Sequence, residues 1–425
     1  MEDGCGPVCA YVSGMRFLSW SRALLCSSFL GLAALTGCED VGSNTDNITD
    51  VPQTDVERQS IGNCWLYATA SWVESMHLSA TGNKFDISQS YWTYWHWYDE
   101  IMTGFGDELE TGGSESVSFD IIRRRGLMAE ADFIPEDSIG EMSSRQSSAL
   151  AKINDELKNG RLASTTARSN GKLVRQVLNE AWNLNADVKA QLDKAFGTTG
   201  KKTYLTSATY KGTKIIRAKD FAVQYTERKT NPSVPTVKLT KLNVAVDEWR
   251  TAAYPWNKSS RRDFQIRVQR ALHDRQPVIV TWMVDFNAME SSGDKRGSFN
   301  METLERNGAG RQGGHMTVFE DYEAETQEFG VLAAGVTLDP ANPDDKAKLD
   351  AALLPSTKIK FWRIKNSWGA FRDDRSSAPG FPGYHDLYQD YMDGPFDWCP
   401  SVEGTKNDDN CHGSTEGWEN VILPP

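Results

Sequence analysis

Apolar residues follow a helical spacing in the first third of the chain and a strand-like alternation in the last third. Spacings of three and four residues predict helices, whereas alternation predicts half-buried strands. The predicted helices cover residues 64–80, 88–99 and 116–126. The predicted strands cover residues 277–284, 315–322 and 358–365, with weaker candidates at 384–391 and 419–423. Helices followed by strands predict an α+β protein with two lobes, and binding sites commonly lie between such lobes.

Between these two parts, residues 143–262 form a more polar segment. Apolar spacing predicts helices over 173–182 and 186–196, and a further amphipathic helix over 261–273. Residues 201–225 show only short strand-like or irregular patterns. The polar segment is therefore interpreted as an insertion into the α+β body.

The predicted helix over 88–99 is unusually aromatic, with seven aromatic or histidine rings between Tyr91 and Tyr98. Such a density could form a stacking platform for a sugar or a nucleobase. The spacing of Tyr91, Trp95 and Tyr98 is helical, however, and rings on one helix face normally pack between helices. We therefore favour a core role for this segment.

The N-terminal residues have the pattern of an export signal. Arg16 and Arg22 precede an uncharged apolar run that is too short to span a membrane, since a spanning helix needs about 20 apolar residues. The run ends in Leu35-Thr36-Gly37-Cys38, which resembles a bacterial lipobox. The resemblance implies that residues 1–37 are a signal peptide, with Met15 as a possible true start. It also implies lipid attachment at Cys38 and export to the cell envelope; an ordinary secretory signal is the alternative.

Composition and charge limit the classes of molecule that the chain is expected to bind. The 425 residues carry a net charge of −12, and 24% of them are charged. We do not expect a chain this acidic to bind nucleic acid. Residues 38–56 are polar and acidic, and we interpret them as a lipidated, flexible tether that leads to a domain over 57–425.

The cysteines fit an exported protein. Removal of the signal peptide would leave four: Cys38, Cys64, Cys399 and Cys411. Cys399 and Cys411 lie twelve residues apart in a polar segment, and an oxidising compartment favours a disulfide between them. With Cys38 acylated, Cys64 would remain unpaired. A lone thiol in an exported protein suggests a chemical role, although a buried structural cysteine is the simpler interpretation of Cys64 alone.

Three separated residues supply the groups that a thiol hydrolase needs. Cys64 lies at the predicted start of a helix, where the helix dipole favours the nucleophilic thiolate. His315 can act as the base, and the side-chain oxygen of Asn366 can orient its imidazole. Trp368 can shield that bond from water. The amide of Gln59 and the backbone N–H of Cys64 can stabilise an oxyanion.

These residues stand in segments that resemble the active-site motifs of papain-like cysteine peptidases. The segments are Gln59…Gly62-Asn63-Cys64-Trp65, Gly314-His315 and Asn366-Ser367-Trp368-Gly369, in the order of that family. Their flanks lean towards the bleomycin hydrolase and aminopeptidase C branch. The resemblance covers roughly residues 57–140 and 262–398. It implies a helical lobe that carries Cys64, an antiparallel β-barrel-like lobe that carries His315 and Asn366, and an active site in the cleft between them.

The resemblance implies hydrolysis of peptide bonds through an acyl-enzyme thioester, on a peptide or protein substrate and without a cofactor. Gln59 precedes Cys64 by five residues instead of the six usual in the family. This shorter loop keeps open a papain-like scaffold without turnover that binds peptides or proteins; acyl transfer by the same triad is the third alternative. The histidines show no metal-ligand spacing, so no metal is expected. We expect a monomer that meets the membrane only through its lipid.

Overall fold

The computed structural model describes residues 51–425, except 105, 141, 203, 230–233, 337, 371–381, 400–410 and 412. The predicted signal peptide and the lipid-attachment residue Cys38 lie outside this part, so both remain predictions. Among the described helices, none combines the length and the apolar character that crossing a membrane would require.

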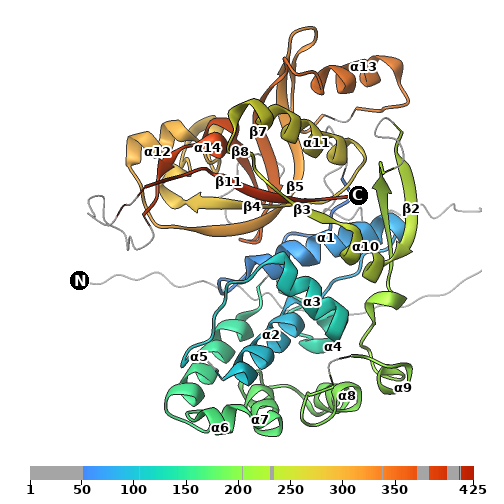
Figure 1. Cartoon of the computed structure of the whole chain (residues 1–425), viewed down its shortest axis with the longest axis vertical. Helices are drawn as coiled ribbons and strands as arrows, with labels where there is room; N and C mark the ends of the chain where they lie inside the picture. The colour runs from blue at the N-terminus through green and yellow to red at the C-terminus, as the bar shows by residue number, and fades with distance from the viewer. Residues whose placement is uncertain are drawn as a thin grey trace, which may run out of the picture. The chain divides into compact units, whose positions relative to one another are not determined.

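Helices around an aromatic core make up the first half of the described chain (Figure 1). They are α1 (Cys64–Thr81), α2 (Gln89–Thr103), α3 (Glu115–Arg125), α4 (Glu130–Phe133), α5 (Ser144–Lys158), α6 (Thr165–Arg168), α7 (Gly171–Ala181), α8 (Ala186–Phe196) and α9 (Ser207–Tyr210). The hydroxyl of Ser88 accepts the backbone N–H of Tyr91 and so caps α2. Tyr91, Trp92 and Trp95 are fully buried. The aromatic segment is therefore core, as its spacing predicts.

The polar segment over 143–262 is not a separate unit. Its helices α5, α7 and α8 place Ile153, Leu178 and Phe196 in the same core as α1 and α2. Its amphipathic spacing is what allows this, because the polar faces remain outward. The segment then forms a hairpin of β1 (Ala222–Glu227) and β2 (Thr236–Lys241), followed by α10 (Leu242–Glu248). Short 3-10 turns, η1 (Ala218–Asp220) and η2 (Lys258–Ser260), complete it.

The second half is built on one antiparallel sheet with the strand order β3-β11-β4-β5-β7-β8, with β6 added on β5. Its strands are β3 (Arg250–Ala253), β4 (Val278–Asp285), β5 (Gln312–Thr326), β6 (Gly330–Leu332), β7 (Lys358–Lys365), β8 (Tyr384–Tyr388) and β11 (Trp418–Leu423). Closing a sheet into a barrel requires its two edge strands to pair. The edges β3 and β8 do not pair with each other in the part of the chain described here. The prediction that the sheet closes into a barrel-like lobe is therefore wrong, because the sheet is open. The prediction of an α+β fold is confirmed.

The open sheet has a helix on each face (Figure 1). On β4, Ile279 packs into the core shared with α1, while Val278 and Val280 pack into a second core shared with α11 (Arg261–His273). Alternate residues of a strand point to opposite faces, so one apolar run serves both cores. The helix α1 thereby lies directly against β4 and β5.

The remaining elements decorate the sheet. They are α12 (Met301–Asn307), α13 (Pro343–Ala352), α14 (Gln389–Asp393), the turns η3 (Phe286–Ala288) and η4 (Gly293–Lys295), and the short pair β9 (Phe396–Asp397) and β10 (Ser414–Thr415). A disulfide joins Cys399 to Cys411 beside this pair. Cys64 is the free cysteine among the described residues.

The folded body begins earlier in the chain than its sequence predicts. Val51 and Thr54 are buried. The hydroxyl of Thr54 donates to Glu74 of α1 at 2.6 Å and accepts from the Nζ of Lys365 at 2.9 Å. The last six residues of the predicted 38–56 tether therefore belong to the body, because paired and buried side chains replace the solvation that a flexible linker would have.

Candidate active site

The start of α1 places Cys64 through a tightly packed turn. A Cβ at Gly62 would lie 2.6 Å from the hydroxyl oxygen of Thr111, so a side chain at this position would force Thr111 to shift. The amide of Asn63 donates to Thr93 at 3.1 Å and to Gln146 at 3.0 Å. These bonds reach α2 and α5, and they fix the turn that delivers the cysteine to the first residue of the helix.

The thiol of Cys64 faces β5. It is 9% exposed, and the backbone of Met316 hydrogen-bonds to it. Met316 directly follows His315 on β5, so the thiol lies against the strand that carries the predicted base. Burial raises the pKa of Cys64 to about 11, and the backbone hydrogen bonds of Met316 and Trp65 lower it by less. The predicted thiolate is thus not the form that this structure favours, because the loss of hydration outweighs the helix dipole.

His315 lies on β5 opposite Trp282 of β4. Its Nε2 is 2.8 Å from the Oδ1 of Asn366, and the backbone N–H of Ser367 donates to the same Oδ1 at 2.7 Å. An atom that accepts a backbone N–H is an oxygen, so Nε2 must carry the hydrogen of the neutral ring. This tautomer leaves Nδ1 as the nitrogen that can take a proton from a thiol.

Aromatic rings and burial set the state of this imidazole. The ring of Trp368 stacks on it with a centroid distance of 4.9 Å and an interplanar angle of 21°. Trp282 meets it edge-on at 5.5 Å. Burial lowers the pKa of His315 to about 4, and the hydrogen bond that its Nε2 donates to Asn366 offsets only part of that shift. At neutral pH the imidazole is therefore uncharged, which is the form a general base needs.

Gln59 is brought to the same region, but its side chain is engaged. Its Nε2 donates to the carbonyl of Ile61 at 2.7 Å, and its Oε1 accepts from the hydroxyl of Ser367 at 2.6 Å. Its backbone N–H donates to the carbonyl of Ser367 at 2.9 Å. One amide hydrogen is therefore used within the loop, and only the other remains for an oxyanion.

Three carboxyls that sequence reasoning missed form a cluster, in which Glu130 is buried, Glu57 is half-buried and Asp86 is exposed. Oxygen atoms of Glu57, Asp86 and Glu130 lie within 4.8 Å of one another, so these residues could hold a metal ion. Burial is the main cause that raises the pKa of Glu57 and brings that of Glu130 to about 9. Carboxyls of this kind hold protons at neutral pH, so the group can be neutralised without a cation. The available signal was Glu74, the one acidic residue of the predicted helix over 64–80, whose charge contributes to the raised pKa values of Glu57 and Glu130.

Comparison with known proteins does not assign this chain to a family. No protein-family model and no curated protein matches the chain. Among solved structures, PepW from Lactobacillus rhamnosis HN001 is similar at 10% identity and a TM-score of 0.39, over 90% of this chain and 82% of that one. Xylellain, a cysteine protease from Xylella fastidiosa, is similar at 11% identity and a TM-score of 0.35, over 90% of this chain and 87% of that one. Both TM-scores are too low for these likenesses to establish a family or an activity.

Proposed function

We propose that this protein is a cysteine-type peptidase that hydrolyses peptide bonds with Cys64 as nucleophile, His315 as base and Asn366 as the orienting group. The observation that carries the proposal is the tautomer of His315: Asn366 engages Nε2, and Nδ1 remains for the thiol. The contact between the Cys64 thiol and the backbone of Met316, on the strand that carries His315, supports the assignment of Cys64 as the nucleophile. The three motif segments that resemble papain-like peptidases support the same assignment.

The reaction follows from these groups. Nδ1 of His315 takes the proton of the Cys64 thiol as sulfur attacks the peptide carbonyl carbon, so the thiolate forms only during attack. The carbonyl oxygen becomes an oxyanion that the backbone N–H of Cys64 can stabilise. His315 then donates the proton to the leaving amine, which leaves a thioester. His315 then takes a proton from a water molecule as the water oxygen attacks the thioester carbonyl carbon. The carbon–sulfur bond breaks, the carboxylic acid is released, and His315 returns the proton to the sulfur of Cys64.

A scaffold without turnover remains a second candidate, and a specific observation favours it. Cys64 is only 9% exposed, and its thiol has a raised pKa. A peptide that is bound but not cleaved would need the surrounding surface and not the thiol. Acyl transfer to an amine would use the same three residues and differs only in what attacks the thioester.

A digest of a peptide library separates these candidates. We expect the wild-type protein to release new N-termini and the Cys64→Ala variant to release none, since the variant lacks the nucleophile. An added primary amine that appears in the products would indicate acyl transfer. Equal products from wild type and Cys64→Ala, or intact peptides in both with retained binding, would reject the peptidase.

A further inference from the structure

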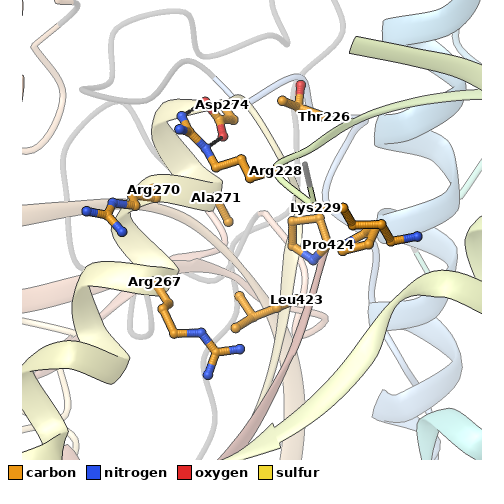
Figure 2. A pocket seen from close by; sticks show the side chains of 10 residues that line it. Thr226, Arg228, Lys229, Arg267, Arg270, Ala271, Asp274, Leu423 and Pro424 are labelled. Atoms are coloured by element: carbon orange, nitrogen blue, oxygen red, sulfur yellow. Dashed lines mark hydrogen bonds and ion pairs between the residues drawn. The ribbon is translucent and has the colours of Figure 1, made fainter. Parts of the chain in front are cut away.

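A second candidate site is a pocket of about 240 Å³ where β1, α11 and β11 end side by side (Figure 2). None of the four candidate active-site residues lines it. Four of its lining side chains are cationic and only one, Asp274, is acidic. In a chain with a net charge of −12, such a local excess of positive charge is distinctive.

The one acidic side chain of the pocket is already paired. Arg228 donates from Nε to one oxygen of Asp274 at 2.5 Å and from Nη2 to the other at 2.6 Å. Figure 2 shows this pair at one end of the pocket. Because both oxygens of Asp274 are used in a fork-like contact, it offers little neutralisation to the other cations.

The other cations have weaker counter-charges. Lys229 is 3.2 Å from Glu248. Arg267 and Arg270 lie three residues apart on α11, both are exposed, and no hydrogen bond or ion pair within the described residues engages either guanidinium. Like charges at this spacing repel one another. The positive charges also act on the neighbouring His273. Burial lowers the pKa of His273 to about 4, and the charges of Arg228 and Arg270 contribute to that shift.

The floor of the pocket is apolar. Ala271 and Leu423 are buried and Pro424 is partly exposed. Figure 2 shows Ala271 between Arg228 and Arg267, with Leu423 beside Arg267. A ligand here would therefore meet a hydrophobic surface beside the guanidinium of Arg267, which no described residue engages.

We propose that this pocket binds a small organic anion whose carboxylate or phosphate head pairs with Arg267 while its apolar body lies on Ala271, Leu423 and Pro424. Guanidinium groups match both oxyanions through two parallel hydrogen bonds, and the apolar floor adds burial that a free inorganic ion cannot use. Arg270 strengthens the local field. The site is independent of the proposed peptidase activity.

Calorimetric titration of the full-length protein tests this site with four probes: phenyl phosphate, phenylacetate, neutral phenylacetamide and inorganic phosphate. We expect saturable binding of phenyl phosphate or phenylacetate, and the better of the two identifies the head group. Phenylacetamide and inorganic phosphate should bind much more weakly, because each lacks one half of the recognised chemistry. Arg267→Gln should weaken binding about tenfold, the value of one charged hydrogen-bonding contact.

A matched variant tests whether the loss of any positive charge on the protein weakens anion binding. Arg296→Gln removes the same charge from a residue that does not line the pocket, and it should leave binding unchanged. The proposal is overturned if Arg296→Gln and Arg267→Gln weaken binding equally. It is also overturned if inorganic phosphate binds as well as phenyl phosphate, or if neither aromatic anion saturates below about 10 mM.

Discussion

The helix and the strands that form the candidate active site hold their side chains in different ways. On the sheet, a hydrogen bond to Asn366 and the rings of Trp282 and Trp368 fix His315 in one tautomer and one orientation. On α1, burial and a packed turn fix the position of Cys64, but they raise the pKa of its thiol. The imidazole of His315 is therefore already in the neutral form that a base needs before a substrate binds. The thiol of Cys64 becomes a nucleophilic thiolate only through proton transfer during attack.

Removal of the base should give the largest effect. We expect His315→Ala to lower kcat by about 10²- to 10⁴-fold, the usual contribution of a positioned general base. His77→Ala is the matched control, since this imidazole hydrogen-bonds to the carbonyl of Ala222, stacks on Phe221 and has no role in the proposed reaction. Initial rates on a cleaved peptide measure both variants. Wild-type turnover in a folded His315→Ala protein would show that His315 is not the general base.

The state of the thiol can be read from alkylation. A thiol with a pKa of about 11 has roughly 300-fold less thiolate at neutral pH than a free thiol of pKa ~8.5. Labelling of Cys64 by iodoacetamide should therefore be slow at pH 7 and should keep rising above pH 9, whereas the unfolded protein should label like a free thiol. Rapid labelling near pH 5–6 would instead reveal a thiolate paired with a charged imidazole.

The orienting residue should matter less than the base. Asn366→Ala should lower kcat by about 10- to 100-fold, because the imidazole remains but loses its fixed tautomer. Asn366→Asp keeps an oxygen for Nε2 and for the backbone N–H of Ser367, so it should recover part of the loss. If both variants lose the same activity, orientation through the side-chain oxygen is not the role of Asn366.

The disulfide should affect stability and not turnover. Replacing Cys399 and Cys411 by Ala opens a loop of twelve residues, which should lower the free energy of unfolding by about 3 kcal/mol in the chain-entropy model. Urea unfolding of the double variant measures the change. An unchanged midpoint would show that the bond adds no stability, and a large loss of turnover would link it to the site.

Local pattern predicted much of this molecule. The helix that starts at Cys64, the strand that carries His315 and the segment that carries Asn366 each depend on short stretches of sequence. The open sheet and the pairing of Thr54 with Lys365 depend on residues far apart in the chain, and spacing alone does not encode them. The pKa of Cys64 was misjudged for a related reason: the helix dipole is visible in the sequence, but the burial that outweighs it is not.

The central claim is that Cys64 attacks with the help of His315, and a trapped acyl-enzyme tests it most directly. A peptide activated as its nitrophenyl ester should transfer one acyl group to the protein at pH 7, and peptide mapping should place that group on Cys64. The adduct should be absent in Cys64→Ala and should form far more slowly in His315→Ala. An acyl group on another residue, or acylation of Cys64 at the same rate in His315→Ala, would contradict the account.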